Sequence, residues 1–454
     1  MNLPNYFLVD LPPEAMLSPA MVTEAGQTLK RNRAQYLAQR TTHSLVRVLC
    51  EVAEAWRRPD NAIRRLALEA GPEKTGFSRA TLQKGLDQFF GQFTPGAFQA
   101  LLLQELGDAQ RLDRLVTASS GEKINPLAMA VGPEFLVHIA AGDIPNPALM
   151  SITLGLLTRS AQFVKCATGS AFLPRLFAHS IYEADAKLGA CLEIAEWRGG
   201  NVELEAALFG EADCVTATGS DETLAAIRAR LPARTRFVGY GHRVSFGFVS
   251  GEALSGFYAN KIVCRAADDV VAWNQLGCLS PHVIYVQNGG EKSPEQFAEL
   301  LASELERRET VEPRGDLPTA SATAIASRRG IYEVRAAHSP ETTRHWCSKG
   351  STAWTVVYEA DARFQLSCLN RFIYVKPVRD LAEALHQAEL VRGQVSTVGL
   401  GVPEHQLEAL ATQLARWGAT RVCPLGQMQN PPLTWRHDGR PALGDLVTWM
   451  DLEI

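Results

Sequence analysis

Cys278 is the residue of this sequence whose surroundings best suit nucleophilic chemistry. It follows Gly277, which lacks a side chain, so neighbouring atoms can approach the sulfur and its backbone amide closely. The run Leu279–Pro281 after it can start a turn or a helix, where the positive end of peptide dipoles favours a thiolate. Its own N–H could face the oxyanion of an attached acyl group. The local sequence therefore predicts a cysteine nucleophile.

The cysteines as a set do not suggest a disulfide framework or a metal site. There are nine of them, scattered and without any C-x-x-C spacing. His345 and Cys347 are close, but no second ligand pair follows at zinc-finger spacing. We therefore expect reduced thiols and no metal. A small buried hydrophobe is the alternative role for any one of them.

The run Asn274–Cys278 (NQLGC) resembles the nucleophile motif of the aldehyde dehydrogenase superfamily. The apolar strand and the amphipathic helix that follow also fit that superfamily. The resemblance implies that Asn274 acts beside Cys278 in catalysis. It also implies an α/β fold with two α/β domains, one binding the cofactor and one carrying the thiol, behind a helical N-terminal region.

In this superfamily a lysine at the end of a strand binds the adenosine ribose of the cofactor. The matching stretch here is Phe163–Thr168 (FVKCAT), with Lys165 in that place. Thr168 replaces the glutamate of NAD-preferring relatives. Because a carboxylate there would repel a 2′-phosphate, its absence permits NADPH, and Lys165 could pair with that phosphate. A solvated surface lysine is the alternative.

Thr218, Gly219 and Ser220 follow an apolar stretch and match the superfamily's next cofactor segment. Backbone N–H groups that open a helix form a natural pyrophosphate site. A simple helix cap is the alternative, because serine suits that role. The position of this turn between the lysine and the cysteine favours the ligand role. No segment fits G-x-G-x-x-G, so an ordinary Rossmann fingerprint is absent.

Two carboxylates of the superfamily are missing. Hydrolytic members carry a water-activating glutamate, but the matching stretch Phe237–Arg243 (FVGYGHR) has none. Without that base, hydrolysis of a thioester is poorly supported, whereas thiol exchange and hydride reduction stay open. The second carboxylate serves the nicotinamide ribose. Leu366–Val375 (LSCLNRFIYV) stands in its place with Ser367 near the glutamate position, so the nicotinamide must be held differently.

In these departures the sequence resembles the LuxC-type acyl-CoA reductases of the bioluminescence fatty acid reductase complex. The specific segments are GYGHRVSFG, NQLGCLSP, LNRFIYVKPV and WRHDGRP, and the resemblance runs from about residue 125 to the end. It implies NADPH-dependent reduction of a long-chain acyl thioester, acyl-CoA or acyl-protein, to a fatty aldehyde through an acyl group on Cys278. An acyl-protein synthetase partner and a homo-oligomer are also implied. Light production does not follow, because relatives act in lipid or natural-product pathways.

The oxyanion donor is a further departure. The superfamily uses the asparagine of an N-x-P segment, and that position is Asp143 here, within Gly142–Pro147 (GDIPNP). A carboxylate beside a developing oxyanion is repulsive unless it is protonated. Asn146 or backbone amides could take over the role. A plain proline-rich turn is the alternative.

Two other functions stay open. A CoA-acylating aldehyde dehydrogenase would use the same site in the oxidative direction. A non-reducing acyl carrier or scaffold subunit is compatible with the missing ribose carboxylate. His242, Arg243 and His437 could contact carrier phosphates or donate protons, with structural hydrogen bonding as the alternative for each.

The elements expected around these residues alternate between strand and helix, which favours parallel sheets. Expected strands are 134–140, 161–165, 190–197, 214–217, 282–286, 371–375 and 395–399; expected helices are 24–57, 97–116, 171–188, 221–229, 294–307, 381–390 and 404–417. We expect a helical region with an NADP-binding domain over 1–238 and a thiol domain over 239–425. The segment 426–454 should pack back on the cofactor domain or on an oligomer partner.

Composition excludes several other classes. The 454 residues are 46% hydrophobic and 21% charged, with a net charge of -4, and show no basic bias of the kind that nucleic-acid binding needs. No apolar run is long enough for a membrane span. The first residues lack the pattern of a signal peptide. A cytoplasmic protein is expected.

Overall fold

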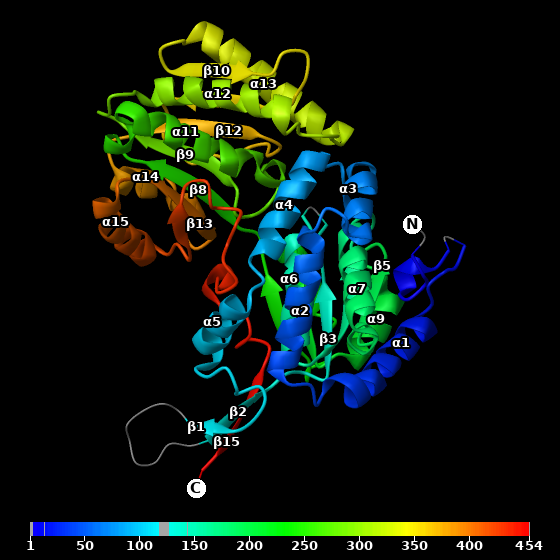
Figure 1. The fold of residues 1–454 in the computed structure, drawn as a ribbon. Helices are drawn as coiled ribbons and strands as arrows, with labels where there is room; N and C mark the ends of the chain where they lie inside the picture. The colour runs from blue at the N-terminus through cyan, green and yellow to red at the C-terminus, as the bar shows by residue number, and fades with distance from the viewer. Residues whose placement is uncertain (1–2, 13, 118–126, 143, 454) are drawn as a thin grey trace. The chain divides into compact units, whose positions relative to one another are not determined.

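The computed structural model describes residues 3–12, 14–117, 127–142 and 144–453, and the chain divides into two compact units (Figure 1). Unit 1 comprises Met1–Thr75, Leu86–Gly241 and Pro432–Ile454, and unit 2 comprises Gly76–Gly85 and His242–Pro431. The boundary expected after residue 238 thus lies inside unit 1, which continues to Gly241. Residues 426–431 belong to unit 2.

A short piece of the N-terminal region, Gly76–Gly85, belongs to unit 2 because its side chains pack there. Lys84 forms ion pairs with Asp268 (3.3 Å) and Glu312 (3.2 Å). A Cβ on Gly85 would overlap the ring of Trp273, so glycine is needed for this close approach. The periodicity of the sequence did not indicate that Gly76–Gly85 packs on unit 2, since the residues that it contacts there are far away along the chain.

The core of unit 1 is a parallel sheet of five strands in the order β5-β4-β3-β6-β7. Its strands are β3 (Phe135–Ile139), β4 (Ala161–Cys166), β5 (Leu192–Glu196), β6 (Cys214–Thr218) and β7 (Arg236–Tyr240). The chain runs outwards from β3 to β5 and then returns to the other side of β3 with β6. This reversal makes a topological switch point between β3 and β6, and open α/β sheets bind ligands outside the carboxyl ends of the strands at such a point.

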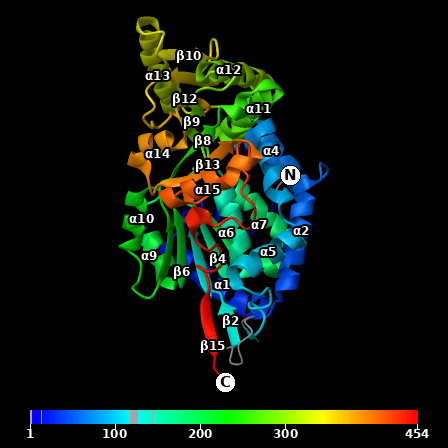
Figure 2. The same ribbon diagram turned by 90° about the vertical axis from the view of Figure 1, so that its left-hand side faces the viewer.

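Helices surround this sheet, as Figures 1 and 2 show. They are α1 (Pro19–Asn32), α2 (Thr42–Arg57), α3 (Ala62–Thr75), α5 (Pro95–Leu106), α6 (Asn146–Leu157), α7 (Phe172–Ala184), α8 (Ala186–Gly189), α9 (Val202–Glu211) and α10 (Asp221–Arg228). The helix α4 (Arg79–Gly91) starts in unit 2 and ends in unit 1. Val22 and Leu29 of α1 and Leu204 and Leu208 of α9 join the buried side chains of the sheet in one apolar core.

A small antiparallel sheet also belongs to unit 1. Its order is β1-β2-β15, from β1 (Val116–Thr117), β2 (Leu127–Val131) and β15 (Thr448–Leu452). The helix expected over 97–116 was therefore wrong in its second half. Gly107 ends α5 in the left-handed conformation (φ 76°), which glycine adopts at no steric cost.

Unit 2 is built on a sheet of seven strands in the order β10-β11-β12-β9-β8-β13-β14. The strands are β8 (Val244–Val249), β9 (Pro281–Gln287), β10 (Thr343–Cys347), β11 (Thr355–Glu359), β12 (Phe372–Val378), β13 (Val395–Gly401) and β14 (Val422–Pro424). All neighbours are parallel except β10, which runs antiparallel to β11. The amino-terminal ends of β8, β9, β12 and β13 therefore lie along one edge of the sheet.

Each face of this second sheet is covered by helices. These are α11 (Gly256–Val271), α12 (Pro294–Val311), α13 (Thr319–His338), α14 (Leu381–Gln387) and α15 (Glu404–Trp417). Ile284 and Val286 of β9 join a core with α11 and α12, whereas Val283 and Tyr285 join a core with α13, α14 and α15. In the described ranges, no helix has both the length and the apolar character that crossing a bilayer would require.

The observed elements follow most of the expected ones. The expected strands and helices between 134 and 229, and those between 282 and 417, are present with shifted ends. The helix expected over 24–57 is interrupted: α1 ends at Asn32, a π-helical turn follows, and α2 starts at Thr42. The strands β7, β8, β10 and β11 and the helices α11 and α13 were not among the expected elements.

Candidate active site

Cys278 is the exposed member of the nine cysteines, all of which lie in the described ranges and none of which forms a disulfide there. Burial raises the pKa of Cys166, Cys191, Cys214 and Cys423 to about 12, so these thiols stay protonated near neutral pH. Cys278 lies just before β9, at the amino-terminal edge of the sheet of unit 2. Exposure makes it the thiol that a substrate can reach.

The chain before Cys278 adopts an unusual backbone conformation. Trp273, Asn274 and Gln275 have φ angles of 49°, 52° and 64°, which is the left-handed region that L-residues avoid. A second such turn occurs just before β12, where residues 369–371 have φ angles of 56°, 55° and 66°. The left-handed conformation costs roughly 1–2 kcal/mol per residue. Side-chain contacts must therefore hold both turns.

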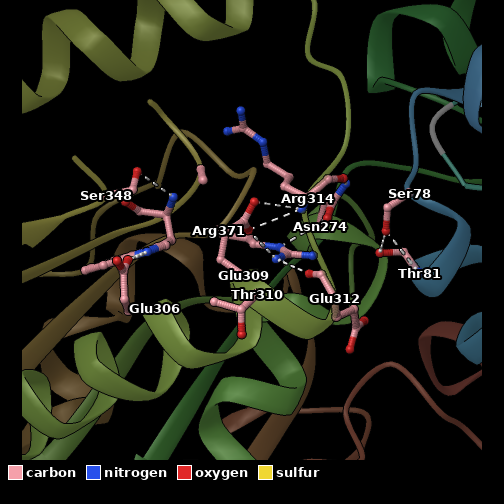
Figure 3. Close-up of polar contacts among 12 residues, drawn as sticks. Ser78, Thr81, Asn274, Glu306, Glu309, Thr310, Glu312, Arg314, Ser348 and Arg371 are labelled. Atoms are coloured by element: carbon pink, nitrogen blue, oxygen red, sulfur yellow. Dashed lines mark hydrogen bonds and ion pairs between the residues drawn. The ribbon is translucent and has the colours of Figure 1, made fainter. Parts of the chain in front are cut away.

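Arg371 connects the two left-handed turns (Figure 3). Its Nε donates to Asn274 Oδ1 (3.2 Å), and its Nη1 donates to Glu309 Oε2 (2.9 Å) and to the Glu312 carbonyl (2.8 Å). The Asn274 amide in turn donates to the Arg314 carbonyl (2.8 Å). Burial lowers the pKa of Arg371 to about 10, against the charges of Glu309 and Glu312, which raise it. Both polar atoms of Asn274 are thus engaged in holding the loop.

Gln275 fastens the same loop to the edge of the sheet. Its Nε2 donates to the carbonyls of Pro281 (2.7 Å) and Phe372 (2.9 Å), the first residues of β9 and β12. The side chain is fully buried. The N-Q pair of the motif therefore has a geometric role that its sequence alone did not specify: it fixes the turn that leads to Cys278.

Ser245 and Gln429 hold the chain around Cys278 from the other side. Ser245 Oγ donates to the carbonyl of Cys278 (2.8 Å) and accepts from the Thr397 N–H (3.1 Å). Gln429 Nε2 donates to Ser280 Oγ (2.5 Å). A Cβ on Gly277 would overlap the Gln429 amide group, which explains the glycine before the cysteine.

In unit 1, Lys165 lies at the carboxyl end of β4. The residue is 4% exposed, and its Nζ lies 5.8 Å from the centre of the Trp197 ring. Burial lowers its pKa, while the charges of Glu205 and Glu196 act in the opposite direction. A buried ammonium group at this edge suits an anionic or hydroxyl-rich ligand better than the solvated surface role that was the alternative.

Thr168 is exposed in the loop after β4. The neighbouring strand β5 ends in a carboxylate, but its oxygens already accept hydrogen bonds. Glu196 at the end of β5 accepts from the N–H groups of Gly169 (2.8 Å) and Ala171 (3.2 Å). Both bonds use its oxygens to hold the loop that leads into α7. The position of Thr168 thus stays without a negative side chain of its own.

The turn Thr218–Ser220 joins β6 to α10. Gly219 N–H donates to the Tyr240 carbonyl (3.2 Å), and Ser220 Oγ accepts from the Thr223 N–H (3.3 Å) as the N-cap of α10. The cap role of Ser220 is therefore present. A helix start at the carboxyl ends of parallel strands, together with the ammonium group of Lys165, fits the phosphate and ribose oxygens of a dinucleotide.

Of the two candidate oxyanion residues, Asp143 lies outside the described residues. Asn146 is the first residue of α6, and its Oδ1 is buried without a hydrogen-bond partner among the described residues. An unsatisfied buried amide oxygen is costly, so this group suits contact with a ligand or water.

The segment in place of the missing water-activating glutamate is β7 and the residues after it. The carbonyl of Gly239 accepts from Arg440 Nη1 (2.9 Å), and the ring of Tyr240 stacks on His437 (4.3 Å between ring centres, 8° between planes). His437 also lies 4.6 Å from Trp435, centre to centre. His437 therefore has a packing role within unit 1.

The predicted site residues form two groups. Cys278 and Asn274 belong to unit 2, whereas Lys165, Thr168, Asn146, Thr218, Gly219 and Ser220 belong to unit 1. Sequence reasoning missed Arg371, Ser245 and Gln429. No local signal could have found them, because each acts on a residue far away along the chain.

Comparison with known families identifies the chain. The sequence model of the family described as Acyl-CoA reductase (LuxC) matches residues 37–449. A long-chain acyl-protein thioester reductase of Aliivibrio fischeri is 24% identical over 326 residues, which cover 70% of this chain and 63% of that protein. Another, of Photorhabdus laumondii, is 20% identical over 419 residues, which cover 90% of this chain and 82% of that protein. The match thus spans less than two thirds of the first relative's length.

Solved structures show the same fold at low sequence identity. A salicylaldehyde dehydrogenase of Pseudomonas putida G7 has a TM-score of 0.70 at 15% identity, covering 97% of this chain and 91% of that one. A bifunctional proline utilization A protein has a TM-score of 0.71 at 14% identity, covering 98% of this chain and 45% of that one. The α/β fold of aldehyde dehydrogenase type, predicted from the sequence, is confirmed by these neighbours. The chain belongs to the acyl-CoA reductase (LuxC) family.

Proposed function

We propose that this protein reduces a long-chain fatty acyl thioester to the aldehyde with NADPH, through an acyl group carried on Cys278. One observation carries the proposal: Cys278, the cysteine of the family's nucleophile motif, is exposed at a sheet edge on a loop that side-chain hydrogen bonds hold in place. The buried cysteines of the chain are not available as thiolates. The names of the relatives support a long-chain acyl thioester as the substrate.

The first half of the reaction belongs to the chain's own thiol. The Cys278 thiolate attacks the acyl carbon, the carbon–sulfur bond to the carrier breaks, and the carrier leaves as a thiolate. Two hydrogen bonds keep the nucleophile in place during this exchange: Ser245 donates to the Cys278 carbonyl, and Gln275 donates to the carbonyl of Pro281 at the start of β9. The acyl group then rests on Cys278 as a new thioester.

The second half needs a reductant instead of water. A nicotinamide cofactor would supply the hydride when bound. Cys278 would be the leaving group, returning to the thiolate as the aldehyde is released. Lys165 and the helix start at Ser220 would hold the ribose and phosphate oxygens of the cofactor. The strand β7 (Arg236–Tyr240) carries no carboxylate that could activate water, which supports reduction over hydrolysis.

A single experiment tests the proposal. The wild-type protein is incubated with tetradecanoyl-CoA, first alone and then with NADPH. We expect mass spectrometry to find a tetradecanoyl group on the peptide that contains Cys278, and NADPH to be consumed with formation of tetradecanal. Acylation without NADPH consumption would support an acyl carrier instead. A parallel reaction with tetradecanal, CoA and NADP measures the reverse direction. Aldehyde oxidation there, without any measurable acyl reduction, would support the oxidative direction.

The preference for NADPH leads to a prediction about Thr168. Thr168→Glu should weaken NADPH binding by about 10–100-fold, because a carboxylate beside a 2′-phosphate replaces a neutral group. Fluorescence titration with NADPH and with NADH measures the effect. Thr168→Gln, which has nearly the same shape without the charge, is the matched control and should bind NADPH like the wild type. An equal loss for both cofactors would contradict the assignment of the 2′-phosphate to this position.

A further inference from the structure

His282 is the extra residue of a β-bulge directly after the nucleophile loop. Ser245 of β8 pairs with Pro281, and the next residue of β8, Phe246, pairs with Val283. His282 therefore has no partner residue in the ladder between β8 and β9. Bulges of this kind change the direction of a side chain, and they are frequent next to active sites.

The bulge turns the imidazole to the other face of the sheet. Strict alternation along β9 would place His282 on the face of Ile284, in the core with α11 and α12. Its ring instead lies edge-on to Phe364 (6.2 Å between centres, 67° between planes), which packs on the opposite core. The bulge thus leaves a polar ring beside Phe364, at the edge of the core with α13, α14 and α15.

Two bonds from Ser367 hold the ring and determine its protonation. The backbone N–H of Ser367 donates to Nδ1 of His282 (3.1 Å), and the Ser367 hydroxyl lies at the same distance from that nitrogen. Because Nδ1 accepts, the neutral ring carries its proton on Nε2. Burial, together with the charge of the nearby His242, lowers the pKa of His282 to about 4. The ring is therefore neutral near pH 7.

The free end of the ring lies at the same sheet edge as the nucleophile. Cys278 precedes β9, Ser367 precedes β12, and both strands start at the amino-terminal edge. Nε2 of His282 hydrogen-bonds to none of the residues that the structure describes, and the residue keeps 7% of its surface exposed. A fixed, neutral N–H donor without an internal acceptor is what an oxyanion site requires.

We infer that Nε2–H of His282 donates a hydrogen bond to the acyl oxygen when Cys278 attacks the thioester, as the second donor beside the backbone N–H of Cys278. As the new carbon–sulfur bond forms, the carbonyl electron pair moves to that oxygen, and it returns when the bond to the carrier breaks. His282 donates without losing its proton. This inference rests on the proposed function, and it supplies a donor where Asp143 replaces the superfamily's asparagine.

Two isosteric amides test the position of the donor. In His282→Gln the side-chain N–H₂ reaches the place of Nε2, whereas in His282→Asn it reaches only the place of Nδ1. The readout is the single-turnover release of CoA from tetradecanoyl-CoA without NADPH, which reports acylation alone. We expect His282→Asn to acylate about 10²–10³-fold more slowly than the wild type, and His282→Gln to stay within about tenfold of it. His405→Asn, on a histidine side chain that is 67% exposed, is the control and should behave like the wild type.

Further readouts separate this role from a structural one. Alkylation of Cys278 by iodoacetamide forms no oxyanion, so its rate should be unchanged in both His282 variants. The ratio of wild-type to His282→Asn acylation rates should be constant from about pH 6 to 8, because a neutral donor does not titrate there. Equal acylation by both variants, fast or slow, would overturn the inference. Absence of acylation in the wild type would instead refute the proposed function.

Discussion

Replacing Cys278 by serine is expected to lower the rate of acylation by tetradecanoyl-CoA by about 10⁴-fold or more, and to abolish aldehyde formation. The reason is chemical: a serine hydroxyl is hardly ionised at neutral pH, and losing the nucleophile of a covalent mechanism removes nearly all of its rate enhancement. CoA release and aldehyde are both measured. The exposed position of Cys278 lets serine fit without a packing change.

A second cysteine serves as the control for this result. Cys264 is half-buried, and burial together with the charge of Glu304 raises the pKa of its thiol. Cys264→Ser should therefore keep the wild-type rate. NADPH binding by Cys278→Ser should also match the wild type, because Lys165 and the turn after β6 belong to the other unit. Reduction retained by Cys278→Ser would disprove the covalent mechanism.

Replacing Arg371 by methionine is expected to destabilise unit 2 by about 3–5 kcal/mol and to disorganise the nucleophile loop. The guanidinium is 1% exposed, and its removal leaves the Glu312 carbonyl and Asn274 Oδ1 without this donor, whereas Glu309, whose side chain is 27% exposed, still accepts from the Arg314 N–H. The expected cost is this large because each buried acceptor left unpaired costs about 1–3 kcal/mol and the ion pair is lost as well. The two left-handed turns would then lose the contact that offsets their strain.

Hydrogen exchange measures this effect separately in each unit, which matters because a protein of two units need not unfold in one step. In Arg371→Met, peptides that cover 272–282 and 369–378 should exchange faster, while peptides of β4 and β6 should not. Arg363→Met is the control, since that side chain is 79% exposed and its ion pair with Asp361 contributes little. Unchanged exchange at 272–282 would show that the loop keeps its conformation without Arg371.

The same loop shows how far the sequence could be interpreted. The motif NQLGC predicted Cys278 as the nucleophile, since chemical type and nearest neighbours are local properties. The alternation of apolar runs with amphipathic stretches predicted most strands and helices of both sheets, because periodicity reflects burial on one face. Gly277 was expected to allow a close approach, and the structure identifies Gln429 as the group that approaches.

What the sequence could not supply are contacts between residues that are far apart in the chain. Asn274 meets Arg371 across 97 positions, His282 meets Ser367 across 85, and Ser245 meets the Cys278 carbonyl across 33. No periodicity records such pairs. Nor does it record a bulge, which follows from the register between two strands and not from either strand alone.

The sequence by itself thus predicted Cys278 as the nucleophile, and it determined the family resemblance and the class of fold, because each rests on local residue types and their spacing. The tertiary structure alone decided how the loop before Cys278 is held. Two strained turns are stabilised by one buried arginine, and a bulge turns a histidine away from the core with α11 and α12. The physical reason is that strain and buried polar groups persist only where distant partners compensate them, and these partners meet only in the folded chain.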